Sequence, residues 1–171
     1  MTDVFTPCCF EMIGSSSDKS SIIRRLVHTM ARENRIDPKF AERIARQVLK
    51  RESYGSSGIG RGLAFPHLRT AEVGEFIGAI GIALHGVNFE AIDRELTRLV
   101  FLTISPIKSR EKHIELLSRL VSLMKDKAVN MHLHHAIRPE DIYQYLADLD
   151  SQFVTELPAN RMSSQGYKRD Q

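Results

Sequence analysis

His67 follows a proline and a glycine-rich loop, an arrangement that could hold an anion beside an imidazole. The loop carries two hydroxyl groups and three glycines: Ser56, Ser57, Gly58, Gly60 and Gly62. Glycine lets the backbone approach a bulky anion and turn its N–H groups toward it, which residues with a Cβ atom do at a cost. Pro66 fixes the backbone just before the histidine. We therefore predict that these five loop residues bind a phosphate and that His67 changes covalently.

Two further side chains, His113 and Arg51, carry groups that suit a phosphate. His113 falls in the first turn of a predicted helix, and apolar residues follow it at helical spacing, so its ring is expected to face inward. The helix dipole there disfavours the imidazolium form and favours a nearby anion. Arg51 ends another predicted helix just before the loop, and its guanidinium offers paired donors in one plane. With His67, these two residues could surround one phosphoryl group.

Each of these residues also has a simpler explanation. His67 or His113 could be bonded to a backbone carbonyl in the core. Arg51 suits a helix C-terminus, where a positive charge is favourable. Glycines and serines in a loop indicate no more than a turn. A small hydrolase with the two histidines as base and acid is a further alternative, but it needs a nucleophile and an orienting carboxylate that the sequence does not indicate.

Apolar periodicity predicts the elements that would position these residues. Two amphipathic helices are expected first, at residues 18–33 with Asp18 as cap and from Pro38 onward with Asp37 as cap. Strands are expected at residues 63–65, 76–84 and 99–104, and helices at 109–124, 128–134 and 139–149. The pattern predicts an α/β fold, a central mixed β-sheet flanked by helices, with His67 at the end of a strand.

The length of 171 residues favours a single domain with its own core. All predicted elements lie within residues 18–149. Residues 1–17 form a weakly patterned N-terminal segment, and residues 150–171 are polar and predict a flexible tail.

Composition excludes several classes of protein. The net charge of +3 is small, and the Lys and Arg residues are spread among acids, so no nucleic acid partner is expected, although acidic proteins could bind. No apolar run could span a bilayer and the N-terminus lacks the layout of a secretory signal, which predicts a cytoplasmic protein without membrane insertion. Cys8 and Cys9 are adjacent and cannot close a disulfide loop.

Three histidines lie close together: His132, His134 and His135. Two of them share a helix face, but no cysteine or carboxylate pattern completes a metal site, so a polar helix face is the simpler interpretation. We predict no metal and no cofactor, since the sequence also lacks a Walker-type loop.

The loop and its flanks resemble the active-site signature of a known family. The matching segments are Arg51-Glu52, Gly55-Ser56-Ser57-Gly58-Ile59-Gly60 and Gly62-Leu63-Ala64-Phe65-Pro66-His67. They are similar to the enzyme IIA proteins of the mannitol/fructose type, from the bacterial phosphoenolpyruvate-dependent sugar phosphotransferase system, and a nitrogen-regulatory branch shares the signature. The likeness runs from about Lys19 to Leu149 and includes the segment around His113.

The resemblance implies roles for three residues. His67 would be the phosphoacceptor, His113 would bond the phosphoryl group, and Arg51 would lie near the phosphate. A neutral imidazole is a competent nucleophile near pH 7, and phosphoryl transfer needs mainly positioning and donors around the oxygens. The protein would be a protein-histidine phosphotransferase component that accepts the group from the histidine phosphocarrier protein and passes it to a IIB partner. In the alternative, phosphorylation controls contact with kinases, transporters or transcription factors, with little onward transfer.

Two positions depart from the family pattern. Leu68 stands where the family usually has a small residue, which could alter the approach of a donor protein. Asp93-Arg94-Glu95-Leu96 stands where an Asp-Gly turn is common. Arg94 is not expected to adopt the positive φ that glycine allows, so a differently built turn is predicted.

Overall fold

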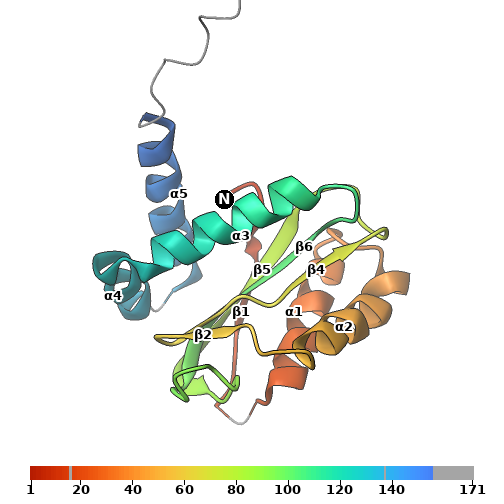
Figure 1. Ribbon diagram of the computed structural model, residues 1–171, viewed down its shortest axis with the longest axis horizontal. Helices are drawn as coiled ribbons and strands as arrows, with labels where there is room; N and C mark the ends of the chain where they lie inside the picture. Colours follow the sequence, from red (N-terminus) through yellow and green to blue (C-terminus); the bar gives the residue numbers. More distant parts are fainter. Residues whose placement is uncertain (16, 137, 156–171) are drawn as a thin grey trace, which may run out of the picture.

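The computed structural model describes residues 1–15, 17–136 and 138–155 (Figure 1). Six strands and five helices follow one another: β1 (Phe5–Met12), α1 (Lys19–Arg32), α2 (Pro38–Glu52), β2 (Gly58–Gly60), β3 (Leu63–Ala64), β4 (His67–Thr70), β5 (Ile77–Val87), β6 (Thr97–Pro106), α3 (Arg110–Lys125), α4 (Lys127–His135) and α5 (Pro139–Thr155). The strands form one mixed sheet flanked by helices, so the predicted α/β fold is confirmed. Residues 156–171, most of the predicted tail, lie outside the described residues.

The two longest strands, β5 and β6, form the centre of the sheet. They pair antiparallel, from Ile77 opposite Ile104 to Val87 opposite Thr97. β1 pairs in parallel with the other edge of β5, and β3 and β4 both pair in parallel with the other edge of β6. β2 pairs antiparallel with β3. Among the described strands, β4 pairs with β6 alone. His67 therefore lies on a strand at the sheet edge.

Side chains along β5 and β6 point alternately to the two faces of the sheet, and each face carries a core. Ala79 and Leu102 pack into the core beneath α1 and α2, whereas Ile80 and Phe101 pack into the core beneath α3, α4 and α5. Successive strand residues point to opposite faces, so a strand covered on both sides must be apolar throughout. Figure 1 shows α1 and α2 on one side of the sheet and α3 on the other.

The first two helices begin where the capping residues were predicted. The Asp18 carboxylate accepts a hydrogen bond from the Ser21 N–H at 2.6 Å, and Asp37 accepts one from the Lys39 N–H at 3.1 Å. Pro38 occupies the first turn of α2, where its missing N–H has no consequence. Helix α2 packs beside β4, so the residues at its C-terminal end lie near the strand that carries His67. No helix of the described ranges combines the length and apolar character needed to cross a bilayer.

Several elements differ from the sequence expectation: β2 and β4 were not predicted, and β5 and β6 extend beyond residues 84 and 104, where the predicted strands ended. Strand β1 forms within residues 1–17, where no element was predicted. Its register against β5 shifts between Phe5 and Phe10, so the alternation of its apolar residues is interrupted and gave no clear signal. Helix α5 continues to Thr155, past residue 149, where the predicted helix ended.

His67 opens β4 instead of closing a strand, so that expectation was wrong. Pro66 has no N–H to donate, and it therefore interrupts the ladder between β3 and β4. Its carbonyl still accepts a hydrogen bond from the Thr103 N–H at 3.0 Å, and pairing with β6 resumes at His67 opposite Thr103. The interruption places the histidine at the start of an edge strand.

Candidate functional site

A cavity of about 390 Å³ lies where the end of α2, the start of β4 and the first turns of α3 meet. Its polar lining consists of two histidines and three arginines: His67, His113, Arg51, Arg69 and Arg110. Its apolar lining consists of Leu68, Ile107, Ile114 and Leu117. No carboxylate of the described residues is part of this lining. The cavity therefore suits an anion, and it brings together the three residues predicted to do chemistry.

The ring of His67 is held in one tautomer by its own loop. Nδ1 lies 2.9 Å from the carbonyl oxygen of Phe65, which can only accept, so Nδ1 carries the proton and Nε2 keeps its lone pair. Burial lowers the pKa of His67 below its ordinary value, and the Arg51 charge lowers it further. The bond to Phe65 and the charge of Glu52 raise it, without reversing the shift. His67 therefore presents a neutral, nucleophilic Nε2 at neutral pH.

His113 faces inward, as its helical spacing predicted, and is only 5% exposed. Its ring centre lies 5.4 Å from that of His67, and the two planes are tilted by 56°. Nδ1 is 2.7 Å from the hydroxyl of Ser105, a buried residue of β6. Burial lowers the pKa of His113 to about 4, with smaller contributions from His67 and Arg69. The second imidazole is therefore also neutral, and it can act as a hydrogen-bond donor to an anion.

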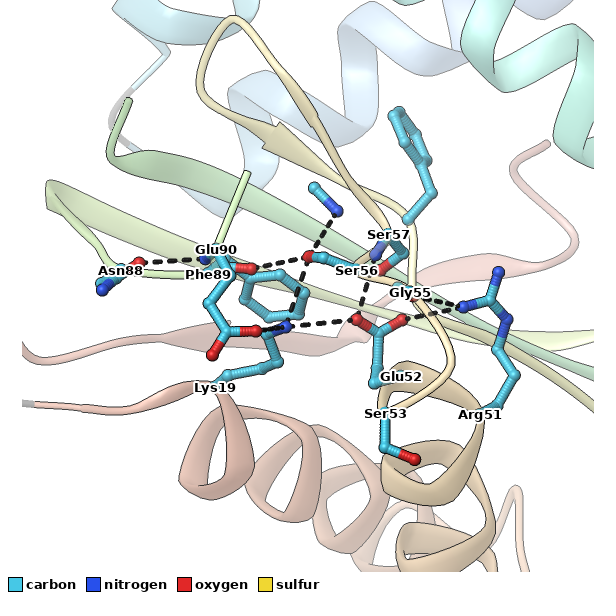
Figure 2. Close-up of polar contacts among 12 residues, drawn as sticks. Lys19, Arg51, Glu52, Ser53, Gly55, Ser56, Ser57, Asn88, Phe89 and Glu90 are labelled. Atoms are coloured by element: carbon cyan, nitrogen blue, oxygen red, sulfur yellow. Dashed lines mark hydrogen bonds and ion pairs between the residues drawn. The ribbon is translucent and has the colours of Figure 1, made fainter. Parts of the chain in front are cut away.

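Arg51 reaches the cavity from the C-terminal end of α2. Its Nη1 donates a hydrogen bond to the Gly55 carbonyl at 2.8 Å and lies 3.6 Å from the carboxylate of Glu52 (Figure 2). The guanidinium is half exposed, so it can meet an incoming anion without leaving the protein surface.

The five loop residues predicted to bind phosphate do not line this cavity. The Ser57 N–H donates to the Glu52 carboxylate at 3.0 Å, and the Ser56 hydroxyl donates to the Phe89 carbonyl at 2.8 Å. The Gly58 N–H donates to the Ser56 hydroxyl at 3.2 Å. These three groups have partners within the protein, and phosphate binding by the five loop residues stays a prediction.

The glycines of the loop serve close packing and a tight hairpin. A Cβ on Gly58 would come within 2.7 Å of the Ala91 backbone, which cannot move aside cheaply. Gly60 and Gly62 have φ values of +90° and +72° at the turn between β2 and β3, a region that favours glycine. The glycine spacing that suggested an anion loop is thus explained by the path of the chain.

Comparison with known proteins identifies the family. The profile of "Phosphoenolpyruvate-dependent sugar phosphotransferase system, EIIA 2" matches residues 4–149, which include β1 and every other strand and helix up to most of α5. The chain belongs to this family. Among its relatives, the fructose-specific EIIABC component of Bacillus subtilis is 30% identical over 136 residues, which are 80% of this chain. The chain spans only 21% of that relative.

The nitrogen-regulatory branch of the EIIA family matches over more of its length. A nitrogen regulatory protein of Pseudomonas aeruginosa is 30% identical over 134 residues, which are 78% of this chain and 85% of that protein. The crystal structure of the nitrogen regulatory protein IIA-Ntr from Neisseria meningitidis superposes with a TM-score of 0.75 at 24% identity, over 84% of this chain and 97% of that one. The complex of mannitol IIA with phosphorylated IIB from Escherichia coli gives 0.66 at 19% identity, over 85% and 99%. These structures share the fold of this EIIA chain.

The prediction that Arg94 does not adopt a positive φ was wrong. Arg94 does adopt a positive φ, of 64°. Its N–H donates to the Ala91 carbonyl at 2.9 Å, and Asp93 accepts hydrogen bonds from the backbone of Arg61 and Glu95 at 2.7 and 3.0 Å. These bonds offset the strain of about 1–2 kcal/mol that a side chain suffers in this region. The other departure from the EIIA pattern, Leu68, lies in the cavity lining beside His67.

Two arginines that line this EIIA cavity, and a buried serine that contacts His113, were missed from the sequence. Arg69 lies two residues after His67 on β4, and alternate strand residues share a face. Arg110 lies three residues before His113 on α3, and residues at this helical spacing share a face. Spacing from the two histidines could therefore have found both arginines. Ser105 lies on β6 and gave no such signal, because only the packing of α3 on the sheet brings it to His113.

The three histidines of α4 make separate contacts. His132 stacks on Tyr145 with ring centres 3.9 Å apart, and Nε2 of His134 lies 2.8 Å from the Arg61 carbonyl. Nδ1 of His135 lies 2.7 Å from the carbonyl of Met131. Within the described ranges, no group of three or more His, Cys, Asp or Glu residues is arranged to hold a metal ion.

Gly58→Ala should destabilise the protein. The new Cβ would meet the Ala91 backbone, so we expect the free energy of unfolding to fall by about 1–3 kcal/mol, as for other overpacked sites. Gly74→Ala is the matched control, because its Cβ would meet nothing within 4 Å. Urea denaturation of the two variants measures the difference. Equal stability would mean that the segment around Ala91 gives way.

Acid should weaken this EIIA fold partly through His113. In the unfolded chain its pKa is 6.5, and in the folded protein about 4, so between these values only the unfolded chain binds the proton. The free energy of unfolding should therefore fall as the pH is lowered from 6.5 to about 4, by up to about 3 kcal/mol from this residue. Urea denaturation across this range should give a smaller fall for His113→Gln. An unchanged pH dependence in that variant would contradict the assignment.

Proposed function

We propose that the chain is a phosphocarrier that holds a phosphoryl group on Nε2 of His67. The single observation that carries the proposal is the tautomer of this ring: Nδ1 donates to the Phe65 carbonyl, which leaves the Nε2 lone pair for a cavity lined by three arginines. Membership of the EIIA family supports the assignment to phosphotransfer. In enzyme terms, the chain is a protein-histidine phosphotransferase component.

The proposed transfer balances without an added base. Nε2 of His67 attacks the phosphorus of a phosphohistidine on the donor protein, a new P–N bond forms in line, and the donor's P–N bond breaks. The donor ring, protonated on its other nitrogen, leaves as neutral imidazole. His67 keeps its Nδ1 proton, and the bond to the Phe65 carbonyl stabilises the positive ring. No cofactor is needed, because the donor supplies an activated phosphoryl group.

The neighbours of His67 stabilise the phosphoryl oxygens. Arg51, Arg69 and Arg110 supply positive charge around them. When the Ser105 hydroxyl donates to Nδ1 of His113, Nε2 of that ring carries the proton and can donate to the group. Donors placed before the reaction are effective because they need no rearrangement as charge moves.

The proposed donor is the histidine phosphocarrier protein, and the proposed acceptor is a IIB protein. The mannitol IIA with which this chain shares its fold has been solved in complex with phosphorylated IIB, which supports such an acceptor. We place the activity in the cytoplasm, where phosphoenolpyruvate is produced.

A regulatory function is the second candidate. The chain covers 85% of the nitrogen regulatory protein of Pseudomonas aeruginosa but 21% of the fructose-specific component of Bacillus subtilis. In this function the phosphorylation state of His67 would control contact with kinases, transporters or transcription factors, with little onward transfer.

Phosphorylation in vitro tests the common part of both candidates. The protein is incubated with phosphoenolpyruvate, the general phosphotransferase enzyme and the histidine phosphocarrier protein, and its mass is measured intact. We expect a gain of one phosphoryl group that acid removes, as a P–N bond requires. Failure to gain the group while the phosphocarrier protein itself is phosphorylated would contradict the proposal.

A further inference from the structure

Glu52 is a buried carboxylate placed between two positive charges at the end of α2 (Figure 2). Its side chain is 3% exposed. One oxygen, Oε2, lies 3.7 Å from Nζ of Lys19 and accepts the Ser57 N–H at 3.0 Å. The other, Oε1, lies 3.6 Å from Nη1 of Arg51 and has no hydrogen bond. A buried negative charge is tolerated only beside such partners.

We propose that Glu52 is a positioning residue: it holds the Arg51 guanidinium where it meets the phosphoryl group on His67. This inference rests on the proposed function. Glu52 does not line the cavity of His67 but borders a separate one of about 550 Å³, so its contact with the site runs through Arg51, beside the last and smallest of the four effects on the pKa of His67, which its charge exerts.

The guanidinium of Arg51 has few other restraints. Among the described residues, its one hydrogen bond joins Nη1 to the Gly55 carbonyl. In Figure 2 the other two nitrogens face away from Glu52, so they remain free to bind an anion. A long arginine side chain has many rotamers, and one neutral hydrogen bond does not fully fix it. The charge of Oε1 supplies a second restraint on the same nitrogen.

The carboxylate is itself held by the loop and by α1. The Ser57 N–H bonds Oε2, and Lys19 is fixed by Glu90 at 2.5 Å and by the Ser56 hydroxyl at 3.3 Å. Lys19 also lies 5.3 Å from the ring centre of Phe89. The loop that resembled a phosphate cradle thus binds an anion of the protein's own, and that anion orients the arginine of the site.

A double-mutant cycle tests the inference. The rate of phosphoryl acceptance from the phosphorylated histidine phosphocarrier protein is measured for wild type, Glu52→Gln, Arg51→Ala and the double variant. Glutamine keeps an oxygen for the Ser57 N–H but removes the charge. We expect Glu52→Gln to lower the rate about tenfold in wild type and less than about twofold in the Arg51→Ala background, because its effect passes through that arginine. Glu42→Gln, which removes an exposed carboxylate of the same helix, is the matched control and should leave the rate unchanged.

The outcomes separate this inference from the function on which it rests. Equal slowing by Glu52→Gln in both backgrounds would mean a general structural role and would overturn the inference, as would no slowing in wild type. If wild type itself gains no phosphoryl group, the proposed function fails and the inference with it. Should the partly buried charge of Lys19 prevent Glu52→Gln from folding, Glu52→Gln with Lys19→Met removes both charges, and the same cycle applies.

Discussion

His67→Ala should abolish phosphoryl acceptance, with the rate falling by about a thousandfold or more. The substitution removes the only atom proposed to bond phosphorus, and the remaining cavity residues can bind the group but cannot accept it. The rate is measured with the phosphorylated histidine phosphocarrier protein as donor and intact mass as the readout. The ring is partly exposed at the start of an edge strand, so the variant is expected to fold.

His132→Ala is the matched control for this experiment. His132 is an exposed histidine of α4 that stacks on Tyr145, and it does not line the cavity. We expect it to accept a phosphoryl group at the wild-type rate. A label that survives in His67→Ala would assign the phosphoryl group to another residue and would remove both the transfer and the regulatory candidates.

His113→Ala should still accept a phosphoryl group but pass it on poorly. Its ring centre lies 5.4 Å from that of His67, and in the proposed function the ring donates one hydrogen bond to the group, whereas His67 forms the bond to phosphorus. Loss of one preorganised donor typically lowers a rate by about a hundredfold, so we expect onward transfer to a IIB protein to fall by that factor. Acceptance and onward transfer are measured separately, by intact mass before and after the acceptor is added.

Ser105→Ala distinguishes the role of the ring from that of its orientation. Without the hydroxyl, the tautomer of His113 that carries its proton on Nε2 loses the hydrogen bond that Nδ1 accepts in the proposed function, and a smaller fall in onward transfer is expected. Complete loss of acceptance in a folded His113→Ala protein would contradict the division of roles between the two histidines. Circular dichroism and urea denaturation establish that each variant is folded.

The two amphipathic helices and the central strands were predictable because their patterns are local. Asp18 and Asp37 cap their helices, and the long apolar runs of β5 and β6 became strands covered on both faces. β1 was not predictable, since its interrupted pattern becomes a strand only by pairing with β5, far along the chain. The positive φ of Arg94 was also missed, because one of the hydrogen bonds that offset its strain, from the Arg61 N–H to Asp93, comes from far along the chain.

The sequence did not predict which internal partners the polar groups of the loop have. The residue types of the loop suit an anion, but composition does not say which anion. The structure supplies the Glu52 carboxylate at the end of α2 as the partner of the Ser57 N–H. Sequence placed Arg51 and Glu52 side by side without indicating that one faces the cavity of His67 and the other a separate cavity.

The sequence by itself determined the residue types of the site and the helices that carry two of them. Helical period placed His113 on an inward face and Arg51 at a helix end, and Pro66 marked the point where His67 follows. The tertiary structure decided which of these groups meet, which nitrogen of His67 is free, and which anion the loop binds. The physical reason is distance along the chain: periodicity and capping act over a few residues, whereas Arg51, Ser105 and His113 come together only when α2, β6 and α3 pack around β4.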